Sequence, residues 1–138
     1  AVMQMVKNSM DHGIEQKQER EALGKSPIGR IRIEIKRASQ KVFVAFYDDG
    51  KGLNREEILS IAEKKGVLKK EKQDYTDQEA YRFLLKPGFT TKSKISLFSG
   101  RGVGLDVVNA GVGALGGKID IESREHMGTT FLMEFPLV

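Results

Sequence analysis

The sequence predicts an α/β (α+β) two-layer sandwich, in which helices cover one face of a mixed, mostly antiparallel sheet. Apolar and charged residues alternate in segments 30–36 and 41–47, which is the period of a half-buried strand. A second pair of strand-like segments spans 118–123 and 129–136. Helical spacing of apolar residues precedes the first pair and recurs before the second. The order helix, two strands, loop, helix, two strands favours a sheet with its helices on one side.

Size and composition predict one domain covering residues 1–138. A chain of 138 residues with 39% hydrophobic residues can enclose one core and little more. It has no cysteine, which excludes disulfides and thiolate metal sites. No apolar run approaches the roughly 18 to 20 residues needed to span a bilayer. We therefore expect a cytoplasmic protein without direct membrane insertion, and the helical pattern already present at Ala1 suggests part of a longer polypeptide.

The first helix is expected to end at Gly13. Polar residues at intervals of four share one stripe of it: Gln4, Asn8 and His12. Apolar residues mark a second face, which we expect to lie on the core: Met3, Val6 and Met10. A short second helix is predicted over residues 16–23, ending at Gly24.

Asp48 is the first candidate binding residue. Strand alternation places it on the face of Phe46, the core side, where the strand ends. A buried carboxylate is costly unless it meets donors, and an adenine amino group is such a donor. About fifty residues later, the glycine-rich run 99–104 opens a helix. Backbone N–H groups in that position can hold phosphates, so the two features together indicate a nucleotide site.

The segment between these features is predicted to be a lid. Asn54 with Glu57 resembles a capping box for a helix reaching about Lys65, and a second helix is expected from Thr76 to Leu85. Residues 66–100 otherwise show little periodicity, so we expect a loop over the site.

The helix after the glycine run carries apolar residues at helical spacing: Leu105, Val108, Val112 and Leu115. Two glycines inside it, Gly111 and Gly113, are expected to pack closely against a neighbour. The lysine run 64–72 carries a single nearby aromatic residue and is interpreted as a solvated face, so no nucleic-acid partner is expected.

Five motifs in order resemble the ATP-binding catalytic domain of chemotaxis-type (CheA-like) histidine kinases, in the Bergerat-fold (GHKL) ATPase superfamily. The resemblance covers essentially the whole chain. The matching segments are the asparagine box 6–15, the first glycine box 48–53, the lid motif 87–91, the second glycine box 99–108 and the final box 128–131.

The resemblance implies a role for each matching residue. Asp48 would accept a hydrogen bond from adenine, Gly50 and Gly52 would let the loop approach the base, and Thr129 or Thr130 would support it. Asn8 would coordinate Mg²⁺, with Lys7 and His12 near the phosphates. The phosphates would be wrapped by the second glycine box: Gly100, Arg101, Gly102, Val103, Gly104 and Leu105. Arg101 or Lys92 would reach the γ-phosphate.

The implied activity is transfer of the γ-phosphoryl group of Mg-ATP to a histidine on a separate domain outside this chain. A response regulator, a coupling protein and chemoreceptors would be partners. Gln4 stands where the family usually has histidine, and glutamine cannot act as a general base. Gln4 therefore favours one alternative, a catalytically silent nucleotide-sensing or scaffolding module. A second alternative is a hydrolytic ATPase of the same superfamily, and Gln4 counts against it because those proteins depend on a glutamate base at or near this position. Taken singly, each residue also has a purely structural interpretation. Asp48 could be a turn former, Asn8 a polar group on a helix surface, and Gly100 part of a loop that enters a helix.

Overall fold

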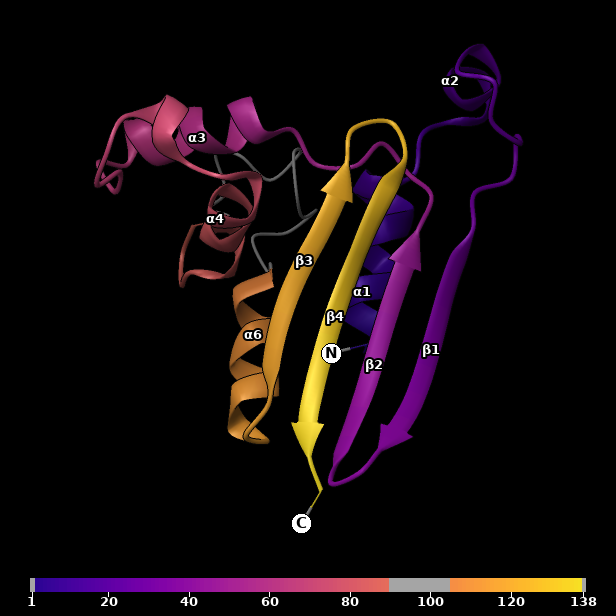
Figure 1. Ribbon diagram of the computed structural model, residues 1–138. Coiled ribbons are helices and arrows are strands. Elements are labelled where there is room, and N and C mark those ends of the chain that lie inside the picture. Colours follow the sequence, from indigo (N-terminus) through magenta and orange to yellow (C-terminus); the bar gives the residue numbers. More distant parts are fainter. Residues whose placement is uncertain (1, 90–104, 138) are drawn as a thin grey trace.

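The computed structural model describes residues 2–89 and 105–137, without the side chains of Val2, Gln4, Asn8 and His12. Four strands form one sheet in the order β1-β2-β4-β3, and each neighbouring pair is antiparallel. They are β1 (Ile31–Ala38), β2 (Lys41–Asp48), β3 (Lys118–Arg124) and β4 (Gly128–Pro136). Figure 1 shows α1 behind the middle of the sheet and α6 beside β3. The predicted sandwich is confirmed, and the described strand pairs are all antiparallel rather than mixed.

The described helices come before β1 and between β2 and β3. They are α1 (Val2–Asn8), a π-helical turn (Ser9–Gly13), α2 (Lys17–Ala22), α3 (Arg55–Lys64), a 3-10 turn (Lys72–Asp74), α4 (Asp77–Arg82), a second 3-10 turn (Phe83–Leu85) and α6 (Leu105–Ala114). Within the described ranges, no helix is both long enough and apolar enough to cross a bilayer.

The core lies between the helices and the inner face of the sheet. Phe46 of β2 and Ile121 of β3 are fully buried on that face, and their rings and methyl groups meet α4, α6 and the first helix. Val108 and Val112 of α6 are buried as predicted. Burial of apolar surface on this side orients β2 so that Asp48 also emerges toward the helices.

The predicted inner face of the first helix is wrong at two of its three positions, although Val6 is partly buried against the core. Met3 and Met10 are 79% and 64% exposed, whereas Met5 is 1% exposed and packs in the core. Ser9 follows Met5 by one turn and is buried as well. Apolar residues on two sides of this short helix allow two choices of inner face, and only packing against the sheet decides between them.

Part of the predicted lid, residues 75–89, contributes side chains to the core, whereas most residues of 66–74 are exposed. Tyr75, Phe83 and Phe89 are buried, and their rings lie 5.6 and 5.7 Å apart in sequence order, centre to centre. The expected helix from Thr76 is present, with a complete capping box between Thr76 and Glu79. The remaining part of the predicted lid, 90–100, lies outside the described residues.

Three further expectations about packing are wrong. Leu115 is 69% exposed, because α6 ends at Ala114 and the helical period no longer applies. A methyl group on Gly111 or Gly113 would meet nothing within 4 Å, so these glycines do not mark a close contact. On β1, Ile35 is 71% exposed on the predicted core side. β1 is one of the two edge strands, and Figure 1 draws it clear of α1 and α6, whereas α6 lies beside β3 at the other edge.

Candidate nucleotide-binding site

Asp48 is the last residue of β2, where the strand leaves the sheet. It lies directly opposite Thr129 in β4 and Ile31 in β1. Its side chain shares a face with Phe46, which is 1% exposed. The predicted position of the carboxylate, on the inner face at the end of the strand, is therefore confirmed.

Three donors hold the Asp48 carboxylate. The Ser9 hydroxyl donates to Oδ2 at 2.9 Å, and the Gly50 backbone N–H donates to Oδ1 at 3.0 Å. The backbone N–H of Thr129 donates as well. Burial raises the pKa of Asp48, and the neighbouring Asp49 charge raises it further. The three hydrogen bonds lower the pKa but do not offset burial, so it remains above its ordinary value. Each carboxylate oxygen has two lone pairs, so the group retains acceptor capacity for a ligand.

Ser9 was missed by sequence reasoning. It follows Asn8 directly, and its place one turn after Met5 is the only signal that it faces the core. Because Ser9 bonds Asp48, it joins the end of the first helix to the end of β2 across 39 residues of sequence.

The glycines after Asp48 lie against protein backbone. A methyl group on Gly50 would overlap the carbonyl of Gly13, and one on Gly52 would overlap the carbonyl of Arg124. Gly52 also has a φ of +74°, a conformation that favours glycine. On β4, a methyl group on Gly128 would overlap the Asp48 carbonyl. Within the described chain, these glycines thus allow three backbone segments to converge at Asp48.

The two candidate threonines lie on opposite faces of β4. Thr129 is 7% exposed, opposite Asp48, and its hydroxyl is 3.0 Å from that of Ser123. Thr130 pairs with Tyr47 and therefore lies on the outer face of the sheet. The structure brings Thr129, and not the side chain of Thr130, to the Asp48 side.

The phosphate-end candidates lie at the end of α1 and beyond. Asn8 is the last residue of α1, and His12 lies in the π-helical turn. Lys7 is exposed and pairs with Asp11 at 3.3 Å. No cluster of three or more His, Cys, Asp or Glu side chains that could hold a metal occurs among the described residues. The magnesium prediction rests on Asn8, whose side chain is outside the description.

The second glycine box is represented only by its helix. Gly100, Arg101, Gly102, Val103 and Gly104 lie outside the described residues, as does Lys92. α6 begins at Leu105, which is 5% exposed with its side chain in the core. Only the backbone N–H of Leu105, and not its side chain, could therefore donate a hydrogen bond to a phosphate. The next residue, Asp106, accepts a hydrogen bond from the Gly88 backbone N–H at 3.4 Å.

Comparison with known families decides what these features belong to. The model of the family described as histidine kinase-, DNA gyrase B-, and HSP90-like ATPase matches residues 1–138. The chain belongs to this ATPase family. The resemblance drawn from the five motifs is confirmed, and the sandwich is a Bergerat fold.

Curated relatives of this ATPase family domain include two chemotaxis proteins CheA. One, from Cereibacter sphaeroides, is 44% identical over 96% of this chain and 19% of its own length. The other, from Bacillus subtilis (strain 168), is 39% identical over 99% of this chain and 20% of its own length. The chain thus spans about a fifth of the length of these relatives. A solved structure, the nucleotide-free catalytic domain of the histidine kinase ThkA, is 27% identical at a TM-score of 0.47, covering 78% of this chain and 53% of that one.

Proposed function

We propose that this domain binds Mg-ATP and transfers the γ-phosphoryl group to a histidine on a separate domain or subunit, in chemotaxis-type signalling. The observation that carries the proposal is the Asp48 carboxylate, partly buried at the end of β2 and held by Ser9, Gly50 and Thr129 with one lone pair to spare. Family membership and the relatives named chemotaxis protein CheA support it.

Asp48 would read the purine. Adenine presents an amino donor at its 6-position, which the carboxylate accepts, whereas guanine presents a carbonyl acceptor there. The guanine carbonyl and the Asp48 carboxylate are both acceptors, so no hydrogen bond could form between them. Thr129, which lies beside Asp48 on the inner face, would support the same edge of the base.

The phosphates would extend past the last turn of α1 toward the start of α6. Gly100 to Gly104 would supply backbone N–H groups, and the positive end of α6 would favour negative charge. Asn8 fits Mg²⁺ through a hard amide oxygen, and it directly precedes Ser9, which contacts Asp48. Bound Mg²⁺ would supply neutralisation of phosphate charge. Lys7, His12 and Arg101 would add positive charge or hydrogen-bond donors around it.

Transfer to histidine fits this residue set better than hydrolysis. A neutral imidazole is already nucleophilic near pH 7, and phosphoryl transfer depends chiefly on positioning and charge neutralisation. Water requires a base, and Gln4 cannot accept a proton. The same glutamine is the observation that favours the second candidate, a silent nucleotide-sensing module.

The acceptor histidine would belong to a domain outside this chain. By the resemblance of its motifs to chemotaxis-type kinases, the protein would work with a response regulator, a coupling protein and chemoreceptors in the cytoplasm.

Phosphoryl transfer tests the proposal. The chain is incubated with γ-labelled ATP, Mg²⁺ and the histidine-containing domain of the same protein. We expect label on the acceptor domain with the acid lability and base stability of phosphohistidine, and loss of label with Asn8→Ala. Binding of ATP without transfer would identify a silent sensor. Phosphate release without an acceptor would identify a hydrolase. Because Gln4 should impair hydrolysis more than transfer to histidine, Gln4→His should raise the rate of hydrolysis more than the rate of transfer, and a variant that left both rates unchanged would contradict this.

A further inference from the structure

Four charged side chains form a compact network beside Asp48. Arg20 on α2 is 1% exposed, and its Nη1 donates to Glu15 Oε1 at 3.0 Å, where the Glu15 side chain is 2% exposed. Arg20 Nη2 donates to Asp49 Oδ2 at 2.9 Å. Lys25 Nζ donates to Glu15 Oε2 at 2.6 Å. Two positive and two negative groups balance, so charge could be buried here without an unpaired ion.

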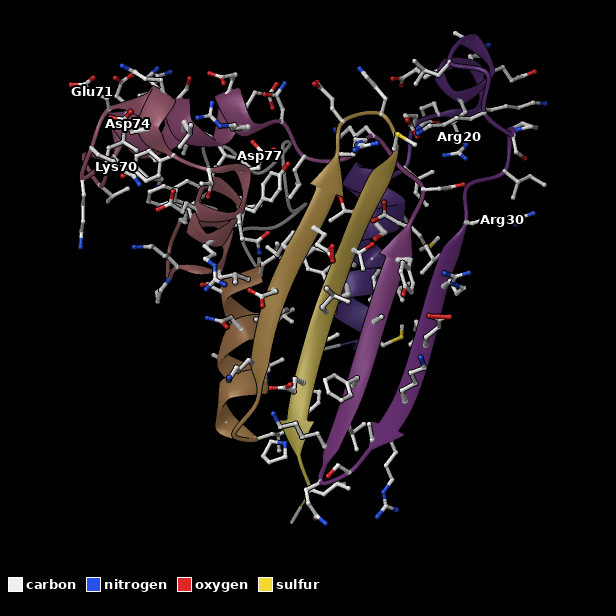
Figure 2. The ribbon with its side chains drawn as sticks, viewed as in Figure 1. Arg20, Arg30, Lys70, Glu71, Asp74 and Asp77 are labelled. Atoms are coloured by element: carbon white, nitrogen blue, oxygen red, sulfur yellow. The ribbon has the colours of Figure 1, made fainter. Side chains whose placement is uncertain are left out.

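The same cations also hold the main chain that follows Asp48. Arg20 Nη1 donates to the Asp49 carbonyl at 3.2 Å. Lys25 Nζ donates to the Asp49 carbonyl at 3.0 Å and to the Gly50 carbonyl at 2.8 Å. Figure 2 shows Arg20 below α2, at the end of the sheet where β2 finishes. Residues 15–25 therefore form a clamp on the two peptide groups next to Asp48.

Those peptide groups set the direction of the Asp48 carboxylate. The Gly50 N–H that donates to Asp48 Oδ1 belongs to the peptide whose carbonyl oxygen is that of Asp49. Both cations bind that carbonyl oxygen. A peptide is planar, so fixing its oxygen also fixes its N–H. Rotation of this peptide would withdraw the Gly50 donor and leave the carboxylate oriented by Ser9 and Thr129 alone.

We propose that Arg20 and Lys25, oriented by Glu15, are positioning residues that hold the Asp49–Gly50 peptide and thereby set how strictly Asp48 selects a 6-amino purine. This inference rests on the proposed nucleotide function. A clamp with a purely structural role would change the stability of the fold and leave base selectivity as it was. The two roles therefore differ in a measurable ratio.

The test compares the dissociation constants of ATP and of inosine triphosphate, which carries a 6-oxo group in place of the 6-amino group. The variants are Lys25→Met, Arg20→Met and Arg20→Lys. Arg55→Met is the matched control, because Arg55 also donates to two backbone carbonyls, those of Lys72 and Tyr75, away from Asp48. Thermal unfolding identifies which variants are folded.

We expect Lys25→Met and Arg20→Met to reduce the preference for ATP by about tenfold, the effect of one hydrogen bond made or lost. Arg20→Lys should retain part of the preference, because it keeps the charge without the fork. Arg55→Met should lower the unfolding temperature and leave the preference unchanged. If Arg20→Met does not fold, Lys25→Met carries the test, because Lys25 has the more exposed side chain of the two.

A double-mutant cycle separates action through Asp48 from general loosening. If the clamp acts through Asp48, Lys25→Met should have no further effect on the ratio in an Asp48→Asn background. An unchanged ratio in folded Lys25→Met, or an equal loss in Arg55→Met, would overturn the inference. Absence of ATP preference in the unmodified chain would instead contradict the proposed nucleotide site.

Discussion

At the scale of single residues, Asp48 is placed at a cost to the free protein. Burial raises its pKa above the ordinary value of 3.8, although hydrogen bonds from Gly50, Ser9 and Thr129 oppose the shift. A group whose pKa is raised by folding stabilises the fold fully only below its unfolded pKa, and this contribution is lost as the pH rises through its folded pKa. Near neutral pH the charged carboxylate therefore destabilises the free protein, and a ligand that donates a hydrogen bond to it would reduce this cost.

Asp48→Asn is predicted to raise the unfolding temperature of the ligand-free chain at pH 7. The amide keeps an oxygen for the Gly50 N–H, and its NH₂ group can donate to the Ser9 hydroxyl. The gain should shrink below about pH 3.8, where the aspartate is itself neutral. Thermal unfolding followed at both pH values checks this. A lower unfolding temperature at pH 7 would show that the charge stabilises the free protein.

The sequence could predict Asp48 but not its immediate partners. Alternation along one strand decides which face Asp48 occupies, and that is local information. Ser9 lies 39 residues away, and Arg20 lies 29 residues from Asp49. No periodicity connects such pairs, so they emerge only when the first helix, α2 and β2 pack together.

At the scale of elements, the loop after β2 depends on close contact between backbones. Gly52 combines a φ of +74° with an approach to the Arg124 carbonyl that leaves no room for a side chain. Gly66 has a similar φ of +70° but has nothing within 4 Å of an added methyl group. Comparing Gly52 with Gly66 therefore distinguishes the cost of backbone strain from the cost of steric overlap.

Gly52→Ala is predicted to destabilise the chain more than Gly66→Ala. Both carry the strain of a left-handed residue, about 1–2 kcal/mol. Gly52→Ala adds an overlap with backbone that cannot rotate away, about 1–3 kcal/mol more. Denaturant unfolding of both variants measures the difference. Equal losses would mean that the loop moves aside without cost.

Helix ends in this chain were more predictable than burial. Asn54 and Thr76 were recognised as helix starts because capping needs only residues three positions apart. The burial of residues 75–89 was not predicted, because Phe83, Leu84 and Leu85 are consecutive in a 3-10 turn. Consecutive apolar residues have no helical period by which an inner face could be identified.

At the scale of the whole molecule, the helices cover the sheet unevenly. Ile35 on the edge strand β1 is 71% exposed, whereas Ile121 on β3, the opposite edge strand, is fully buried where α4 and α6 contact the sheet. Alternation along segment 30–36 places Ile35 on the apolar side of its strand. The strand period identifies the face of a side chain, but which strands the helices reach depends on helix length and packing, which the period does not contain.

The stability of the whole molecule is predicted to fall in acid. Burial alone would raise the pKa of Glu15, but the hydrogen bond and charge of Lys25, with the charge of Arg20, hold it below its usual value. Burial alone would likewise raise the pKa of Asp49. The hydrogen bond from the Arg30 N–H and the hydrogen bond and charge of Arg20 outweigh burial, so the pKa of Asp49 is lowered. A lowered folded pKa gives stability above the unfolded pKa, which is lost as the pH falls through the folded value.

Glu15→Gln should therefore lower stability at neutral pH and weaken its dependence on acid. The loss at pH 7 should be about 3 kcal/mol or more, because Arg20 and Lys25 would then have only the Asp49 carboxylate in the network, which leaves one positive charge uncompensated. Between about pH 6 and about pH 3, the variant should lose less stability than the unmodified chain. Glu21→Gln, on an exposed residue of α2, is the control. Parallel pH profiles for Glu15→Gln and the unmodified chain would contradict the charge network.

Titration calorimetry with ATP and GTP in the presence of Mg²⁺ tests the central claim most directly, using the unmodified chain and Asp48→Asn. We predict that ATP binds, that GTP binds much more weakly, and that Asp48→Asn loses about 1–3 kcal/mol of ATP binding free energy. Equal affinity for ATP in the two proteins would contradict the assignment of Asp48 as the adenine acceptor.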